Sequence, residues 1–79
     1  MRIEVLGTGC ARCNQLEKDV YNALAELGVD AEVEKVQDLQ KILQYKVMMT
    51  PALVIDGKVK SAGRVPRKEE LHQLIKESR

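Results

Sequence analysis

The sequence has neither tryptophan nor phenylalanine, and its 79 residues include only two tyrosines. The core must therefore consist of the aliphatic side chains of leucine, isoleucine, valine and alanine. A chain of this length buries only about 60–65% of the surface that its unfolded form exposes, so two layers of secondary structure around one thin core are expected. We expect a single domain that spans residues 1–79.

The sequence also lacks a long apolar run and an excess of positive charge. No run approaches the roughly 18 residues that cross a bilayer, and the start at Met1 does not resemble a signal peptide. We therefore expect a complete, cytoplasmic chain without a membrane partner. The net charge of +1 argues against nucleic acid as a partner, because phosphate binding depends on many lysine and arginine side chains. Two cysteines are too few for a disulfide-rich scaffold.

Short apolar or alternating runs predict four strands. These runs cover residues 2–6, 31–35, 52–55 and 58–61. The run at 52–55 is apolar on both faces and is expected inside the sheet, whereas the charged runs at 31–35 and 58–61 are expected at its edges. Asp56-Gly57 is a hairpin signal that joins the third and fourth strands.

Three- and four-residue spacing of apolar side chains predicts three helices. The first begins at Cys10 and is closed by Gly28, and Cys13 belongs to its buried face. The second is capped by Asp38, and its expected inward residues are Leu39, Ile42, Leu43 and Val47. The third has Pro66 in its first turn, and its expected inward residues are Leu71, Leu74 and Ile75.

The resulting order, β-α-β-α-β-β-α, predicts an α/β fold. The first two strands are joined by a helix and should run parallel with a right-handed crossover, whereas the hairpin adds an antiparallel pair. With the charged strands outside, the prediction is a four-stranded mixed sheet in the order 2-1-3-4, flanked by three helices on its two faces.

The two cysteines form the motif Cys10-Ala11-Arg12-Cys13, at the point where a glycine-containing loop enters the first helix. Unpaired N–H groups and the positive dipole end of a helix favour a thiolate over a thiol, and the charge of Arg12 acts in the same direction. Cys10 precedes the buried stripe of the helix, whereas Cys13 continues it. An exposed attacking thiol with a sheltered resolving thiol one turn away suits a dithiol exchange reaction.

Other roles of this cysteine pair stay open at this point. A closed zinc site needs four ligands, and the one histidine, His72, lies far away on the last helix, so we expect no zinc. Two thiolates suit Cu(I), although small copper chaperones have the order β-α-β-β-α-β and a methionine where this chain has Thr8. A third alternative is an interaction domain that keeps the fold without rapid thiol exchange.

Four motifs together resemble a known family. They are the run Gly7-Thr8-Gly9-Cys10-Ala11-Arg12-Cys13, then Thr50-Pro51, Asp56-Gly57 and Ala62-Gly63-Arg64. Over essentially its whole length the chain resembles the thioredoxin-fold superfamily. It is most similar to the glutaredoxin-sized, thioredoxin-like proteins of the redox-active disulfide protein 2 family. The resemblance implies a thioredoxin/glutaredoxin-like fold and a protein disulfide oxidoreductase.

The resemblance also assigns roles to individual residues. It implies that Cys10 is the nucleophile and Cys13 the resolving thiol of a redox-active disulfide, with no other bound cofactor. Pro51 is expected to be cis and to face the disulfide, an ordinary trans proline being the alternative. The expected substrate-binding residues are Thr8, Gly9, Ala11, Thr50, Pro51 and Gly63, and the backbone of Thr50 would pair with an extended substrate segment. The expected partners are a protein or small-molecule disulfide as substrate and a separate reductase as electron donor, and the expected state is a monomer.

Three further residues are expected near the cysteine pair. Thioredoxins bury an acid that helps to deprotonate the resolving thiol; Glu4 is the candidate upstream of the pair, and a solvent-facing or ion-paired Glu4 is the alternative. Met48 and Met49 are candidates for the lining of a substrate groove, since thioether side chains adapt to varied partners. At least one of these two methionines is expected in the core.

Overall fold

The computed structural model describes residues 1–9 and 11–78, and the described residues form four strands and three helices. In chain order the elements are β1 (Arg2–Leu6), α1 (Ala11–Leu27), β2 (Glu32–Val36), α2 (Leu39–Gln44), β3 (Ala52–Ile55), β4 (Lys58–Ala62) and α3 (Lys68–Glu77). The predicted order β-α-β-α-β-β-α is confirmed.

The four strands form one mixed sheet in the order β2-β1-β3-β4, as predicted. β1 pairs in parallel with β2 and antiparallel with β3, and β3 pairs antiparallel with β4. All four residues of β3 are buried because this strand lies inside the sheet. Asp56 and Gly57, with φ angles of 50° and 82°, turn the chain from β3 to β4. Two successive positive φ angles are typical of a tight hairpin turn.

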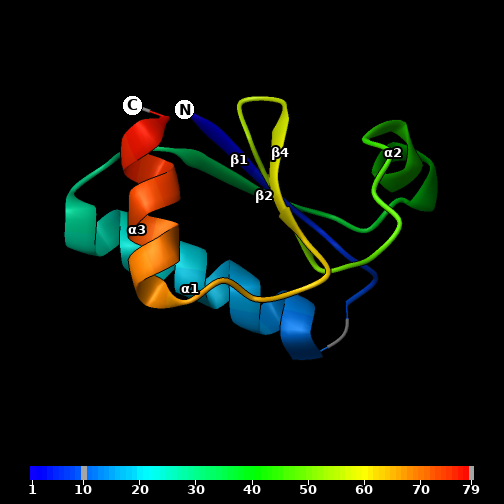
Figure 1. Ribbon diagram of the computed structural model, residues 1–79, viewed down its shortest axis with the longest axis horizontal. Helices are drawn as coiled ribbons and strands as arrows, with labels where there is room; N and C mark the ends of the chain where they lie inside the picture. The colour runs from blue at the N-terminus through cyan, green and yellow to red at the C-terminus, as the bar shows by residue number, and fades with distance from the viewer. Residues whose placement is uncertain (10, 79) are drawn as a thin grey trace.

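Helices cover both faces of the sheet, with α1 and α3 on one side and α2 apart from them (Figure 1). Each face carries its own apolar cluster. The larger cluster joins α1 and α3 to β1 and β3, and its members include Ile3, Val5, Leu16, Leu53 and Ile75. The smaller cluster lies under α2, and its members include Leu6, Val36, Ile42 and Val54.

α2 is shorter than predicted and buries fewer of its residues. The helix ends at Gln44, and Lys46 follows with a φ of 59°, a value that cannot continue a right-handed helix. Ile42 and Val47 are buried as predicted, whereas Leu39 and Leu43 are 61% and 58% exposed. A helix of six residues turns only one of them, Ile42, fully towards the sheet. The prediction that Leu39 and Leu43 face the core is therefore wrong.

Three other boundaries differ from the prediction. β4 ends at Ala62, one residue later than expected. β2 covers Glu32–Val36, one residue later than expected. α3 begins at Lys68 after an extended N-cap at Arg67, with φ −70° and ψ 162°, so Pro66 lies before the helix and not in its first turn. Pro66 is buried where the chain enters α3, and Leu71 and Ile75 form the buried stripe of that helix, with Leu74 partly buried beside them.

Candidate active site

The pairing of three strands brings three separate loops to one edge of the sheet. Leu6 at the end of β1 is the partner of Ala52 at the start of β3, and Ala52 is the partner of Ala62 at the end of β4. Gly7, Pro51 and Gly63 are the next residues beyond these partners. Because strands in register keep their ends together, the three loops that carry the predicted motifs meet at this edge.

Cys13 lies in the first turns of α1 and is fully buried, as predicted. It begins the apolar stripe of the helix, which continues through Leu16, Val20, Ala23 and Leu24. The stripe faces the sheet, and this is why the thiol is withdrawn from solvent. The predicted nucleophile Cys10 lies outside the described residues.

Gly7 is the backbone neighbour of the Cys13 sulfur. A Cβ atom added to Gly7 would stand 2.1 Å from Cys13 Sγ and 3.0 Å from Cys13 Cβ. The same position lies 3.9 Å from the Cβ atom of Thr50. Cys13 therefore packs against the loop between β1 and α1, and Thr50, in the loop before β3, approaches the same place.

The Thr50-Pro51 peptide bond is cis, as expected, and the expectation that Pro51 faces the disulfide stays a prediction. Pro51 is fully buried, and its carbonyl oxygen accepts a hydrogen bond from the N–H of Gly63 (2.9 Å). Gly63 has a φ of 78°, and a Cβ atom added there would lie 3.1 Å from Met49 Cβ. The loop that carries Thr50 is thus held against the residue that follows β4.

The other predicted contact residues form an exposed border around this edge. Thr8, Gly9, Ala11 and Arg12 are exposed. Met48 and Met49 are 95% and 65% exposed, so the prediction that at least one of them belongs to the core is wrong. The Met49 side chain lies beside Gly63: a Cβ atom added to Gly63 would stand 3.5 Å from both Sδ and Cε of Met49.

Glu4 lies in the centre of β1, and its side chain is only 14% exposed. Its carboxylate accepts hydrogen bonds from Tyr45 Oη (2.6 Å) and Arg2 Nε (3.1 Å). Arg2 also pairs with Glu34 on β2. Glu4 alternates along the strand with Ile3 and Val5, which belong to the cluster under α1 and α3, so its side chain lies on the α2 face of the sheet. The contacts of Glu4 match the ion-paired alternative stated above.

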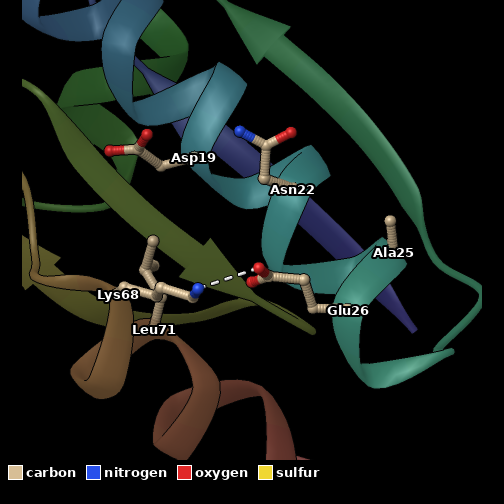
Figure 2. Close-up of a pocket in the computed structure, with 6 residues that line it drawn as sticks. All are labelled: Asp19, Asn22, Ala25, Glu26, Lys68 and Leu71. Atoms are coloured by element: carbon tan, nitrogen blue, oxygen red, sulfur yellow. Dashed lines mark ion pairs between the residues drawn. The ribbon is translucent and has the colours of Figure 1, made fainter.

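A separate hollow of about 360 Å³ lies between α1 and α3. Figure 2 shows its lining residues, Asp19, Asn22, Ala25, Glu26, Lys68 and Leu71. An ion pair between Lys68 Nζ and Glu26 Oε2 (2.9 Å) crosses it. None of the predicted site residues that the structure describes lines this hollow, and the described lining residues on α1 all follow Cys13.

The described residues, 1–9 and 11–78, also bear on metal binding and membrane insertion. Within these ranges no three histidine, cysteine, aspartate or glutamate side chains come together as a group that could hold a metal ion. None of the helices formed by the described residues has the length and apolar character needed to cross a bilayer.

A family model of the thioredoxin domain matches residues 1–76 of the chain. A thioredoxin from Methanothermobacter thermautotrophicus is 44% identical over 75 residues, which cover 95% of this chain and 97% of that protein. The chain belongs to the thioredoxin domain family. Another thioredoxin, from Methanocaldococcus jannaschii, is 39% identical over 74 residues, which cover 94% of this chain and 85% of that protein.

Membership of the thioredoxin domain family confirms the resemblance to the thioredoxin-fold superfamily. The thioredoxin relatives support thiol–disulfide oxidoreductase activity in general, and thioredoxins use a redox-active disulfide without a bound cofactor. The family also indicates disulfide-containing proteins as substrates and a reductase as electron donor.

Sequence reasoning missed two contacts of the predicted site residues. Tyr45 had no assigned role, and no spacing rule connects it with Glu4, which lies 41 positions earlier. Gly7 was part of the Gly7–Cys13 motif, but no role was predicted for it. Its contact with Cys13 could have been expected, because a glycine between a strand and Cys-x-x-Cys marks a place where a side chain can approach the backbone closely.

Proposed function

We propose that the protein reduces disulfides through the pair Cys10 and Cys13, with Cys10 as the nucleophile and Cys13 as the resolving thiol. The observation that carries this proposal is the burial of Cys13 at the start of α1, beside the loop of Thr50 and Pro51, in a chain of the thioredoxin domain family. A buried thiol at this place is protected from solvent oxidants and can react only with a sulfur brought to the same edge.

The proposed reaction has two exchange steps. The Cys10 thiolate attacks one sulfur of the substrate disulfide; a Cys10–substrate bond forms, the substrate S–S bond breaks, and the first substrate thiolate leaves. Cys13 then loses its proton and attacks Cys10 Sγ, which breaks the mixed disulfide and releases the second thiolate. The substrate gains two electrons, and the protein is left with a Cys10–Cys13 disulfide. A separate reductase restores the dithiol.

The edge with its exposed border is the proposed substrate-binding surface. The surface joins the exposed Thr8, Gly9 and Ala11 to the half-buried Thr50 and Gly63 and to the buried Pro51, and the exposed Met48 and Met49 extend it. An extended segment beside Thr50 would exchange backbone hydrogen bonds with this residue, and the flexible thioethers would cover its apolar side chains. Arg12 is proposed to favour the Cys10 thiolate through its charge. The role of Glu4 in tuning the thiols, the cytoplasmic location, the monomeric state and the single domain over residues 1–79 stay predictions.

The test mixes the reduced protein, freed of excess reductant, with an aromatic disulfide whose released thiolate absorbs visible light. Cys10→Ser is expected to lower the rate by about a hundredfold or more, because the attacking sulfur is removed. Cys13→Ser is expected to accumulate one substrate fragment per protein, detectable by mass spectrometry, because the mixed disulfide cannot be resolved. Gly28→Ala, at the far end of α1, serves as the control for altered stability.

Two results would contradict the proposal. An active Cys10→Ser variant would refute the assignment of the nucleophile. Tight binding of Cu(I) by the wild-type chain, together with turnover no faster than that of the doubly substituted chain, would favour the metal-binding alternative.

A further inference from the structure

Gly7 is a buried glycine whose backbone conformation does not require a glycine. The left-handed φ angles among the described glycines belong to Gly9, Gly28, Gly57 and Gly63, and Gly7 is not one of them. The N–H group of Gly7 donates to the carbonyl oxygen of Val36 (2.9 Å), so its backbone continues the pairing of β1 with β2. An alanine at this position would be free of backbone strain. The reason for a glycine must lie in the space beside it.

The space beside Gly7 is filled by Cys13. A methyl group on Gly7 would stand 2.1 Å from Cys13 Sγ, far inside van der Waals contact. It would also stand 3.0 Å from Cys13 Cβ. Rotation about χ1 of Cys13 moves Sγ but leaves Cβ in place, so a change of rotamer relieves only part of the overlap.

The position of the sulfur matters because Cys13 is helical. In a helix, χ1 near +60° is rare, which leaves two rotamers, and both direct a side chain towards the N-terminal turn of the helix. The rotamer present in the structure places Sγ against Gly7. A side chain on Gly7 would block this rotamer and would leave the other as the alternative.

We infer that Gly7 is a positioning residue for the resolving step: its missing side chain provides the place in which the Cys13 sulfur is held for attack on Cys10. This inference rests on the proposed function. In that step Cys13 loses its proton, the Cys13–Cys10 bond forms, and the Cys10–substrate bond breaks with release of the substrate thiolate. The attacking sulfur must lie in line with the bond that breaks. The first step uses only Cys10 and is independent of the rotamer of Cys13.

The test compares the two steps in Gly7→Ala and in the wild-type protein. Stopped-flow mixing with the aromatic disulfide gives two thiolate releases, the first from attack by Cys10 and the second from resolution by Cys13. We expect the first rate to change by less than about twofold and the second to fall by about tenfold or more. Gly28→Ala is the matched control: the same substitution at a φ of 66°, with no atom within 4 Å of the added methyl group outside its chain neighbours. It should lower stability without changing the ratio of the two rates.

A thermal unfolding cycle gives a second readout that does not depend on activity. Gly7→Ala is expected to lower the unfolding midpoint more in the wild-type background than in the Cys13→Ala background, because the sulfur that overlaps the methyl group is then absent. If Gly7→Ala does not fold, recovery of folding in the Gly7→Ala, Cys13→Ala double variant supports the inference.

Equal slowing of both steps, or equal loss of stability in the two Cys13 backgrounds, would overturn the role of Gly7 while leaving the dithiol mechanism intact. Failure of the double variant to fold would do the same. A wild-type protein that releases no thiolate would instead reject the proposed function itself.

Discussion

A hydrogen bond between Tyr45 and Glu4 joins the end of α2 to the centre of β1. The hydrogen bond from Tyr45 Oη to Glu4 and partial burial raise the pKa of the Tyr45 phenol above its ordinary value of 10.0. Loss of the phenol proton would place a phenolate beside a carboxylate. The neutral phenol is therefore favoured in the folded state.

This contact makes part of the stability depend on alkaline pH. A raised folded-state pKa means that the contribution of Tyr45 is complete below the ordinary value and is lost as pH rises through the folded-state pKa. The chain has no tryptophan, so a Tyr21→Phe background leaves Tyr45 as the only tyrosine, and its tyrosinate absorbance can be followed directly. We expect Glu4→Gln to move this titration to lower pH, because the neighbouring negative charge is removed. An unchanged midpoint would contradict the contact.

At the scale of single elements, the sequence pattern predicted the start of α2 but not its end. The cap at Asp38 was predicted from residue type and is present: its carboxylate accepts from the N–H of Gln40 (2.9 Å). The end of the helix was not predicted, because Lys46 has no residue-type signal for its φ of 59°. Periodicity then counted Leu39 and Leu43 as core, although a short helix on one sheet face has room for fewer inward residues.

The two kinds of α2 residue should respond differently to substitution. Ile42→Ala is expected to lower the free energy of unfolding by about 2–4 kcal/mol, because a 2%-exposed side chain leaves a cavity in the cluster under α2. Leu43→Gln is expected to change it by no more than about 0.5 kcal/mol, because Leu43 is 58% exposed. Urea unfolding of both variants measures the difference. Similar losses would mean that Leu43 is covered in solution.

At the scale of the whole molecule, Glu26 connects the two helices that share a face of the sheet. Its carboxylate lies 2.9 Å from both Lys68 Nζ and His72 Nε2 (Figure 2 shows the lysine pair). The hydrogen bond from Lys68, followed by that from His72, lowers the pKa of Glu26 below its ordinary value of 4.5. The pair with Glu26 also raises the pKa of Lys68.

The connection between α1 and α3 should weaken in acid. With a lowered folded-state pKa, the contribution of Glu26 is complete above pH 4.5 and is lost as pH falls through the folded-state pKa. Glu26→Gln is expected to unfold at a lower temperature near neutral pH and to lose less stability than the wild-type protein on acidification. Calorimetry over this pH range tests both points. Molar salt should reduce the difference between the two proteins, because the groups are exposed; a difference insensitive to salt would point to packing instead.

The sheet order could be predicted because each strand's composition matches its place: charged β2 and β4 at the edges and apolar β3 inside. The burial of Cys13 followed from the stripe that leads to Leu16. By contrast, the contact of the Cys13 sulfur with Gly7 depends on the register of β1 and the entry angle of α1. Neither can be predicted from local residue types. The contact of the exposed Met49 with Gly63, the residue after β4, likewise depends on the packing of segments that are distant in the sequence.

The strand directions place Met1 and the end of α3 at one pole of the molecule and the predicted site at the other. The N–H of Asp56 donates to the carbonyl oxygen of Arg2 (2.8 Å), and Ser78 lines a hollow together with Asp56, so Met1, the hairpin turn and the end of α3 gather at one pole (Figure 1). Gly7, Pro51 and Gly63 occupy the opposite pole. A resin or a fused partner attached ahead of Met1 therefore holds the protein at the pole opposite Gly7, Pro51 and Gly63. The edge of the sheet that carries Cys13 then faces the surrounding solution.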